Sequence, residues 1–170
     1  KQICFVDTRR LGAVWVIPKG GLDDFWADKK LGPEIYPDAR NPQWWKNRFV
    51  GIKAPIKNAL LRQERVAGLG NICASEICFR ARVSPKLGTD LLSDDQWKAI
   101  ARATQSYLST IIAEESGREI QYVTQGGGLP EAFWVYGREG AGCRRCQQPI
   151  SRIVQAGRAT FYCEYCTPTG

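Results

Sequence analysis

The four cysteines between Cys143 and Cys166 are the residues whose types and spacing define a chemistry most narrowly. They form two C-x-x-C pairs, Cys143 with Cys146 and Cys163 with Cys166, separated by sixteen residues. Each pair fits a tight turn that aims two sulfurs at one point, so two such turns together can bind one Zn²⁺ tetrahedrally. Two disulfides or four free thiols are the alternatives. We expect one structural zinc ion, with no coordination position left for water.

The segment between the two pairs is expected to hold these turns together as a hairpin. Residues Ile150 to Val154 and Ala159 to Tyr162 are rich in β-forming side chains, and Ala156-Gly157 between them suits a turn. A hairpin of this length buries too little apolar surface to be stable alone, whereas a structural zinc contributes about 10–16 kcal/mol in small fingers. The metal would therefore be the core of this segment.

Composition excludes several classes of protein. The 170 residues suffice for one ordinary core and a small module, and no signal peptide or long apolar span is present. The other cysteines, Cys4, Cys73 and Cys78, show no pairing pattern of a secreted disulfide scaffold. We expect a protein of a reducing compartment, the cytoplasm with its nucleoid in a bacterium or the nucleus in a eukaryote, with no membrane partner.

The positive charge is concentrated in two parts of the chain. The formal net charge is +7, and residues 40–86 carry ten basic and two acidic side chains. Residues 143–170 carry four basic and one acidic, whereas residues 87–142 between these parts carry four and eight. Any single lysine can simply be solvated, but two separate basic surfaces indicate that the protein clamps a polyanion, of which nucleic acid is the natural candidate.

Two strands and a linker are expected at the start of the chain. Ile3–Val6 and Ala13–Ile17 are strand-like, and residues 7–12 connect them. Because two strands are not a stable sheet, we expect them to be the end of a larger upstream β-sandwich domain, and the chain, which contains no methionine, to be a piece of a longer protein. The Gly-, Pro- and Asp-rich stretch that follows is typical of an exit from such a sheet.

Helical spacing dominates the middle of the chain. Pro55 suits a first helical position, and a glycine turn, residues 68–70, precedes a second helix over residues 72–81 with Asn71 as its N-cap. Ser93 and Gln96 form a capping box for an amphipathic helix that reaches Gly117. Residues 133–136 are expected to form a short strand that leads into the finger.

These elements predict an α+β fold of four segments. Residues 1–32 would be the end of the N-terminal β-sandwich, and residues 33–50 a linker. Residues 51–134 would form a helical DNA-binding domain, and residues 135–170 a β-hairpin zinc finger.

The turn Gly68-Leu69-Gly70-Asn71 has a definite chemical potential. A dinucleotide-binding loop is excluded, because no strand precedes the glycines and no third glycine follows. A tight turn before a helix does present backbone N–H groups to a phosphate oxygen, and the Asn71 amide can add a further donor. The alternative is that Asn71 only caps its own helix.

These motifs together resemble one known family. The run from Val66 to Glu76, with Phe79 and Pro85, resembles the helix-two-turn-helix of the formamidopyrimidine-DNA glycosylase and endonuclease VIII family. Residues 135–140, both cysteine pairs and residues 157–162 are similar to that family's zinc finger, and residues 7–12 and 31–34 to its late strand loop and interdomain hinge. The match is collinear over the whole chain, and Tyr136-Gly137-Arg138-Glu139-Gly140 favours the formamidopyrimidine branch.

The resemblance implies base-excision DNA repair by a monomer acting on damaged duplex DNA. Such an enzyme flips an oxidised purine such as 8-oxoguanine or a formamidopyrimidine, cleaves its glycosidic bond and nicks the abasic strand by β,δ-elimination. In the family an N-terminal proline amine attacks the sugar and the following glutamate moves protons. Neither residue is in this chain, so we expect the chain alone to bind DNA without the glycosylase step.

The resemblance also assigns roles to individual residues. Arg158 matches the finger arginine that holds the phosphates beside the flipped nucleotide and is the family's acid for δ-elimination. Lys57 and Asn71 match further phosphate contacts, and Arg9 matches the arginine that fills the hole left by the flipped base, unless it is a solvated loop arginine. The weaker correspondences, also on the DNA surface, are Lys53, Tyr136 and Arg152.

Three departures from the family pattern affect the expected lesion preference. Leu11 stands where the branch usually has a phenylalanine wedge, which reduces the stacking area. Cys73 replaces the usual tyrosine, and the loop containing Gly126–Gly128 is short.

Two other hypotheses remain beside the enzyme: a truncated, non-catalytic module that binds damaged, abasic or bent duplex DNA, and an unrelated zinc ribbon that binds RNA or protein.

Overall fold

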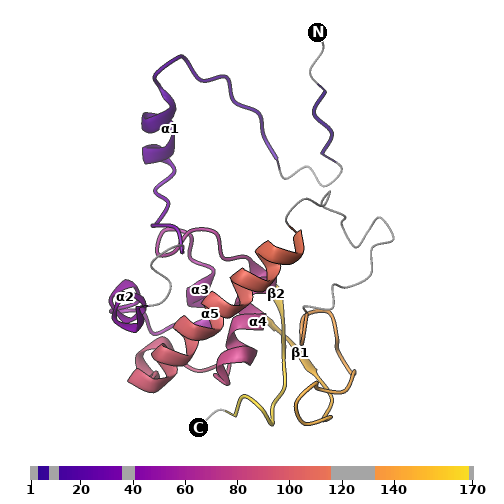
Figure 1. Cartoon of the computed structure of the whole chain (residues 1–170). Coiled ribbons are helices and arrows are strands. Elements are labelled where there is room, and N and C mark those ends of the chain that lie inside the picture. The colour runs from indigo at the N-terminus through magenta and orange to yellow at the C-terminus, as the bar shows by residue number, and fades with distance from the viewer. Residues whose placement is uncertain (1–3, 8–11, 36–40, 116–132, 169–170) are drawn as a thin grey trace. The chain divides into compact units, whose positions relative to one another are not determined.

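The chain divides into two compact units. The computed structural model describes residues 4–7, 12–35, 41–115 and 133–168. The first unit runs from Lys1 to Leu31 and the second from Gly32 to Gly170 (Figure 1). The second unit contains all the helices after α1 and the hairpin, and each unit is described by itself.

The described residues of the first unit contain one short helix, α1 (Leu22–Asp28). The two strands expected over residues 3–6 and 13–17 were predicted wrongly for this chain, because residues 4–7 and 12–17 form no strand. A strand exists only where a neighbour completes its hydrogen bonds, and no described residue does so here. The apolar side chains that suggested strands are largely exposed, among them Val14 and Val16.

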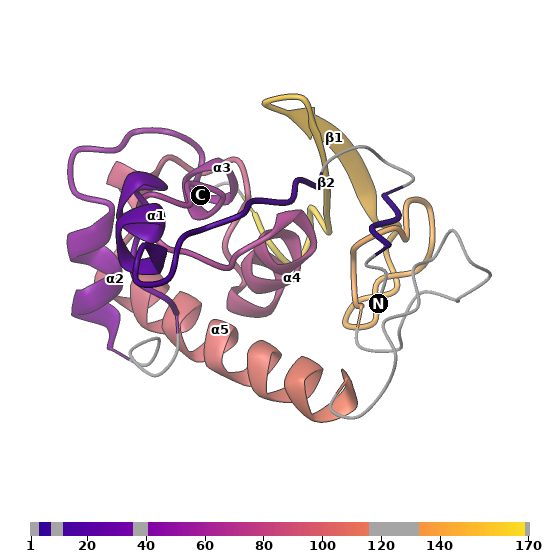
Figure 2. The same cartoon turned by 90° about the horizontal axis from the view of Figure 1, so that it is seen from above.

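Among the described residues of the second unit, five helical elements build the core. They are α2 (Pro42–Arg48), α3 (Ile56–Leu60), α4 (Asn71–Ala81), the 3-10 helix η2 (Thr89–Leu91) and α5 (Asp94–Glu115). The long helix α5 packs against α2 and α4, while α3 packs against α4 (Figure 2). The predicted capping box is confirmed, because the Ser93 hydroxyl accepts from Gln96 N at 3.2 Å and Gln96 Oε1 accepts from Ser93 N at 2.9 Å.

An aromatic column joins α2 to α5. The ring of Phe49 stacks between those of Trp45 and Trp97, with centroid separations of 6.2 and 5.7 Å. All three side chains are buried. Helix α2 lies in the stretch expected to be a linker, and its burial follows from this column, which places the chain from Pro42 onward in the helical core.

Helix α4, predicted over residues 72–81, has a buried stripe formed by Ala74, Ile77, Cys78 and Ala81. Its start differs from the prediction by one position: Gly70, in extended conformation, is the N-cap, and Asn71 is the first helical residue. The Asn71 side chain therefore does not cap its own helix. The helix ends at Ala81, and its C-cap residue Arg82 adopts the left-handed conformation with φ 57°.

The predicted hairpin is present as β1 (Ser151–Gln155) and β2 (Arg158–Tyr162), which pair antiparallel. Gln155 pairs with Arg158, and Ala156 and Gly157 between them both have positive φ. This two-residue turn is of the kind that matches strand twist. In the part of the chain that the structure describes, no helix is long and apolar enough to cross a membrane.

Candidate metal centre and nucleic-acid interface

The four cysteines meet at one point, as their spacing predicted. The Sγ atoms of Cys143, Cys146, Cys163 and Cys166 all lie within 4.8 Å of one another. Cys143 and Cys166 are 3.8 Å apart at sulfur, and Cys146 and Cys163 are 3.5 Å apart. Since a sulfur tetrahedron with metal–sulfur bonds of about 2.3 Å has edges of about 3.8 Å, the arrangement fits one tetrahedral ion.

Backbone turns prepare the sulfurs for a metal. Around the first pair, Cys143 N donates to Gln148 O and Gln147 N to Cys143 O, which closes the knuckle. Burial opposes ionisation of Cys143, but backbone N–H groups of Arg145 and Cys146 donate to its sulfur and lower its pKa to about 7. A thiolate is the form that binds a metal, so this turn favours the ligand state.

Glu76 fixes the chain where it enters the finger. Its fully buried carboxylate accepts backbone N–H bonds from Trp134, Val135 and Tyr136, at 2.9 to 3.0 Å. These residues were predicted as a short strand, which is wrong, because their N–H groups converge on one carboxylate. The buried charge is compensated by these donors and by Arg80, 3.7 Å away.

Arg145 attaches the first knuckle to the end of α4. Its guanidinium donates to the carbonyls of Phe79 at 2.7 Å and Arg80 at 3.2 Å, and stacks over the Phe79 ring at 4.4 Å. The Phe79 carbonyl also accepts from Arg82 N at 3.1 Å, so the arginine adds a second donor to it and a donor to the Arg80 carbonyl in the last turn of the helix.

Asn71 joins the glycine turn to the hairpin. Its Nδ2 donates to the carbonyl of Ala159 at 2.9 Å, and Ala159 directly follows Arg158 on β2. The Asn71 Oδ1 atom is buried and has no hydrogen-bond partner among the described residues. The same holds for Thr160 Oγ1 on β2. The junction therefore contains unsatisfied polar groups beside Arg158.

Lys57 is the least expected side chain of this junction, because it is fully buried. Its ammonium has no hydrogen-bond partner among the described residues. Burial lowers the pKa of Lys57 to about 8; Cys78 acts against this shift and the positive charge of Arg158 adds to it. A buried ammonium without a partner costs several kcal/mol, so an anion entering between Lys57 and Arg158 would be strongly favoured.

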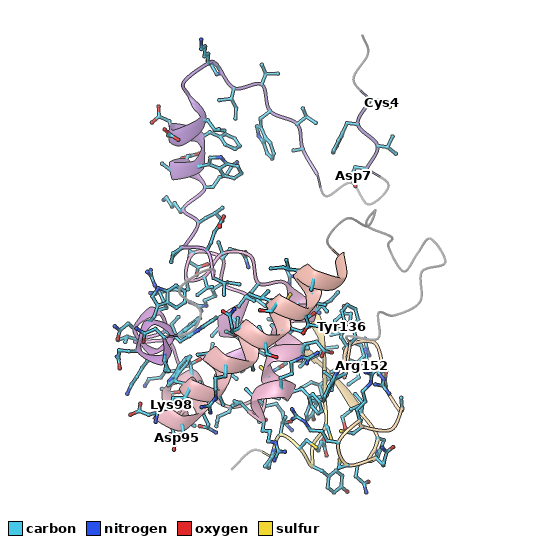
Figure 3. All side chains as sticks on the ribbon, in the orientation of Figure 1. Cys4, Asp7, Asp95, Lys98, Tyr136 and Arg152 are labelled. Atoms are coloured by element: carbon cyan, nitrogen blue, oxygen red, sulfur yellow. The ribbon has the colours of Figure 1, made fainter. Side chains whose placement is uncertain are left out.

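The remaining predicted DNA contacts lie at different places. Arg158 is exposed as the first residue of β2, and Lys53 is exposed before α3. Tyr136 packs on Phe161, with ring centroids 5.0 Å apart, and Arg152 is the cross-strand partner of Phe161, so both lie at the hairpin (Figure 3). Arg152 is 3.9 Å from Glu139. Arg9, Leu11 and the Gly126–Gly128 loop fall outside the described residues.

Two residues that organise the site, Glu76 and Arg145, were not identified from the sequence. The available signal for Glu76 was an acidic residue inside an otherwise buried helical stripe, which demands a partner. No local signal identifies its donors, because they lie about sixty residues away, at separations of 58 to 60. Arg145 lies between Cys143 and Cys146, where the C-x-x-C pattern indicates a metal site and gives no signal for the residues between the cysteines.

Comparison with known proteins gives a consistent result. Residues 31–121 match the formamidopyrimidine-DNA glycosylase H2TH domain. A formamidopyrimidine-DNA glycosylase of Gloeobacter violaceus is 36% identical over 170 residues, covering 97% of this chain and 60% of the relative. That of Gluconobacter oxydans is 38% identical over 167 residues, covering 95% of this chain and 60% of the relative.

Solved structures agree with the sequence matches. A complex of Lactococcus lactis Fpg with DNA containing an abasic site matches 88% of this chain and 56% of its own, with a TM-score of 0.75 and 28% identity. MutM (Fpg) from Thermus thermophilus matches 89% of this chain and 59% of its own, with a TM-score of 0.74 and 32% identity. The chain spans about 60% of the length of the curated relatives it matches.

Proposed function

The chain belongs to the formamidopyrimidine-DNA glycosylase family, and on that premise we propose that it is the DNA-binding part of a base-excision repair glycosylase. The proposed partner is duplex DNA with a damaged base or an abasic site, bound by a monomer in the cytoplasm of a bacterium. The relatives' names support the reaction class, and the fold comparison includes a complex with abasic DNA.

One observation carries the proposal: the junction of Lys57, Asn71 and Arg158. Asn71 holds the strand next to Arg158, and the Lys57 ammonium is buried close enough to feel the arginine's charge. Two cations and an amide N–H donor are groups that bind a phosphodiester. We infer that a backbone phosphate occupies this place, with Lys53, Tyr136 and Arg152 as outer contacts and Arg9 and Leu11 acting in the opened base stack.

The proposed substrates are oxidised purines such as 8-oxoguanine and formamidopyrimidines, with β,δ-elimination at the resulting abasic site. Arg158 would bridge phosphates and donate the proton for δ-elimination. The family's nucleophile is an N-terminal proline followed by glutamate, whereas the Pro-Glu pairs of this chain, Pro33-Glu34 and Pro130-Glu131, are internal; the chain has no histidine. This polypeptide by itself should therefore bind abasic DNA without excising a base, and excision would require a protein that contains the N-terminal pair.

We propose that the four-cysteine site holds one Zn²⁺ with a structural role. All four donors are sulfur atoms, which would fill the four coordination positions of a tetrahedral ion. The hairpin that carries Arg158 lies between the two cysteine pairs. When bound, the ion supplies the rigidity that fixes both knuckles. The chain's own part is positional: Arg145 fastens the first knuckle to α4, and Glu76 fastens the entry segment.

The test of this function uses fluorescence anisotropy with a labelled duplex containing a tetrahydrofuran abasic analogue. The chain is expected to bind this duplex more tightly than the undamaged duplex, and to give no excision and no borohydride-trapped adduct with 8-oxoguanine DNA. Equal affinity for both duplexes, or binding that does not respond to salt, would contradict the proposal.

A second experiment separates the enzyme from the non-catalytic module. The protein that contains this chain together with the family's Pro-Glu segment should form a borohydride-trapped adduct with 8-oxoguanine duplex. Absence of any adduct with oxidised purines, while abasic DNA is still bound, would favour the non-catalytic module.

A further inference from the structure

A second cationic site lies at the opposite end of α4 from Asn71. A surface hollow of about 400 Å³ is lined by the end of α4, one face of α5 and the start of the finger. Its described lining contains four arginines and no acidic side chain: Arg80, Arg82, Arg102 and Arg145. Because α4 rises about 1.5 Å per residue, this hollow is about 15 Å along the axis from Asn71 and is separate from the proposed phosphate junction.

The guanidinium groups in this hollow are held in fixed orientations. Arg80 and Arg145 stack against the Trp134 ring at 4.9 and 5.7 Å, and Arg80 also lies over Tyr107 at 5.0 Å. A guanidinium that stacks by its face keeps its N–H donors in the plane, directed outward. Arg145 already donates to the carbonyls of Phe79 and Arg80, and Arg80 is 3.7 Å from Glu76, so the exposed Arg82 and Arg102 offer the N–H donors for an oxyanion.

Like charges converge here although they repel. Arg80, Arg82, Arg102 and Arg145 all line the one hollow. Arg82 also occupies the left-handed position that ends α4, where glycine or asparagine is preferred and a longer side chain costs about 1 kcal/mol. The fold thus places the exposed Arg82 at the hollow in spite of the repulsion between like charges and the strain of a left-handed backbone.

The hollow continues along α5 into a mainly apolar one. A second depression of about 320 Å³ shares Arg102 and Ser106 with the first and adds Ala101 and Gln105. On α5 the positions 99, 102, 103 and 106 fall on one face, and their small side chains leave room beside Arg102. Together the two depressions form a trough with a cationic end and an apolar end.

We propose that this trough binds an acidic peptide segment of a protein partner, in which carboxylates contact the arginines and an aliphatic side chain enters the apolar end. Charge complementarity favours an anionic occupant. The concave, two-part shape favours an extended peptide over duplex DNA. The phosphates on the convex surface of a duplex are charged and would make no favourable contact with the apolar depression.

The test is fluorescence anisotropy with a short labelled peptide in which aspartate pairs alternate with leucines. The chain should bind this peptide, and the same peptide with asparagine for aspartate should bind at least about tenfold more weakly. The double variant Arg82→Glu, Arg102→Glu should lose at least about tenfold, and the single variant Arg102→Glu at least about fivefold. Arg62→Glu, which makes the same charge change as that single variant at another exposed position, should lose less than about twofold.

A second variant separates binding from folding. Arg82→Gly relieves the left-handed strain, so its thermal unfolding midpoint should equal or exceed that of the wild type while peptide affinity still falls. The proposal would be overturned if Arg62→Glu lost as much peptide affinity as the trough variants, or if both Arg82 variants bound the peptide as the wild type does. It would also be overturned if abasic duplex displaced the peptide and the double variant lost duplex affinity to the same extent.

Discussion

Asn71 and Ala159 are 88 positions apart in the chain and are joined by a hydrogen bond of 2.9 Å from the side-chain amide to the main-chain carbonyl. This bond ties the first residue of α4 to the strand that carries Arg158. The helical turn and the finger therefore present their polar groups as one surface.

Replacement of Asn71 tests that connection. Asn71→Ala removes the donor to Ala159, so the free energy of unfolding should fall by about 1 kcal/mol in urea titrations. Affinity for abasic duplex should fall about tenfold by anisotropy, because the amide is also a proposed phosphate ligand. Asn71→Asp should bind more weakly still, since it adds a negative charge facing a phosphate. Asn47→Ala, at an exposed position of α2, is the control and should leave DNA affinity unchanged.

Glu76 is expected to control the docking of the finger entry. Glu76→Gln keeps the shape but loses the charge that accepts three backbone N–H groups, so the free energy of unfolding should decrease by about 2–3 kcal/mol. Urea denaturation measures this loss. The control Glu64→Gln changes an exposed acid and should stay within about 0.5 kcal/mol of the wild type. A similar stability for both variants would refute the role of Glu76.

Removal of the metal should uncouple the hairpin from the helices. Chelation, or Cys163→Ser, should abolish binding of one zinc per chain and reduce DNA affinity, because the strand carrying Arg158 loses its support. The helical circular-dichroism signal should persist, since the aromatic column of α2 and α5 does not involve the finger. Cys4→Ser should keep the full zinc content. Undiminished DNA binding by metal-free protein would contradict the structural role.

The titration of Lys57 gives a pH signature. Its pKa is lowered by burial to about 8, so the free protein holds this side chain neutral above that pH. A bound phosphate raises the pKa, and binding then takes up a proton. DNA affinity should be flat below pH 8 and fall above it by up to tenfold per pH unit.

The same shift affects folding. The unfolded chain retains the proton up to about pH 10.5, the unperturbed value, so the contribution of Lys57 to stability increases as the pH rises from about 8 toward 10.5. Lys57→Met should remove both dependences in anisotropy and urea titrations. A pH profile of DNA binding that is identical in wild type and variant would refute the assignment.

Arg158 should contribute one ionic contact. If it holds a backbone phosphate, Arg158→Ala should make the log–log dependence of affinity on salt shallower by about one. Titrations of the duplex at several salt concentrations give this slope. Lys98→Ala, which removes an exposed lysine paired with Asp95 at the start of α5, should leave the slope unchanged (Figure 3). Equal slopes for wild type and Arg158→Ala would contradict the phosphate contact.

Local patterns predicted most of the second unit. The cysteine spacing predicted the sulfur cluster, the Ser93 and Gln96 pair predicted the start of α5, and Ala156-Gly157 predicted the hairpin turn. Each of these depends on neighbours within a few residues. The direction of the Asn71 side chain could not be predicted in this way, because a one-residue shift of the helix start turns it from its own backbone to Ala159.

Features that depend on distant residues were missed or wrong. Residues 133–136 resemble a strand by composition, but their N–H groups belong to Glu76, which a local pattern does not show. Val14 and its neighbours have β-forming side chains, yet a strand needs a partner that the described residues lack. The burial of Lys57 likewise could not be predicted from the sequence, because a lysine side chain normally lies at the protein surface.

The two-residue turn at Ala156 and Gly157 makes the finger intolerant of changes in length. Side chains alternate between the faces of a strand, so Arg158 shares a face with Thr160, which is buried toward the helices. A single-codon insertion or deletion within residues 151–157 would shift the register by one and turn every following side chain to the other face. Natural variants and engineered libraries should therefore accept substitutions in this hairpin far more readily than insertions or deletions.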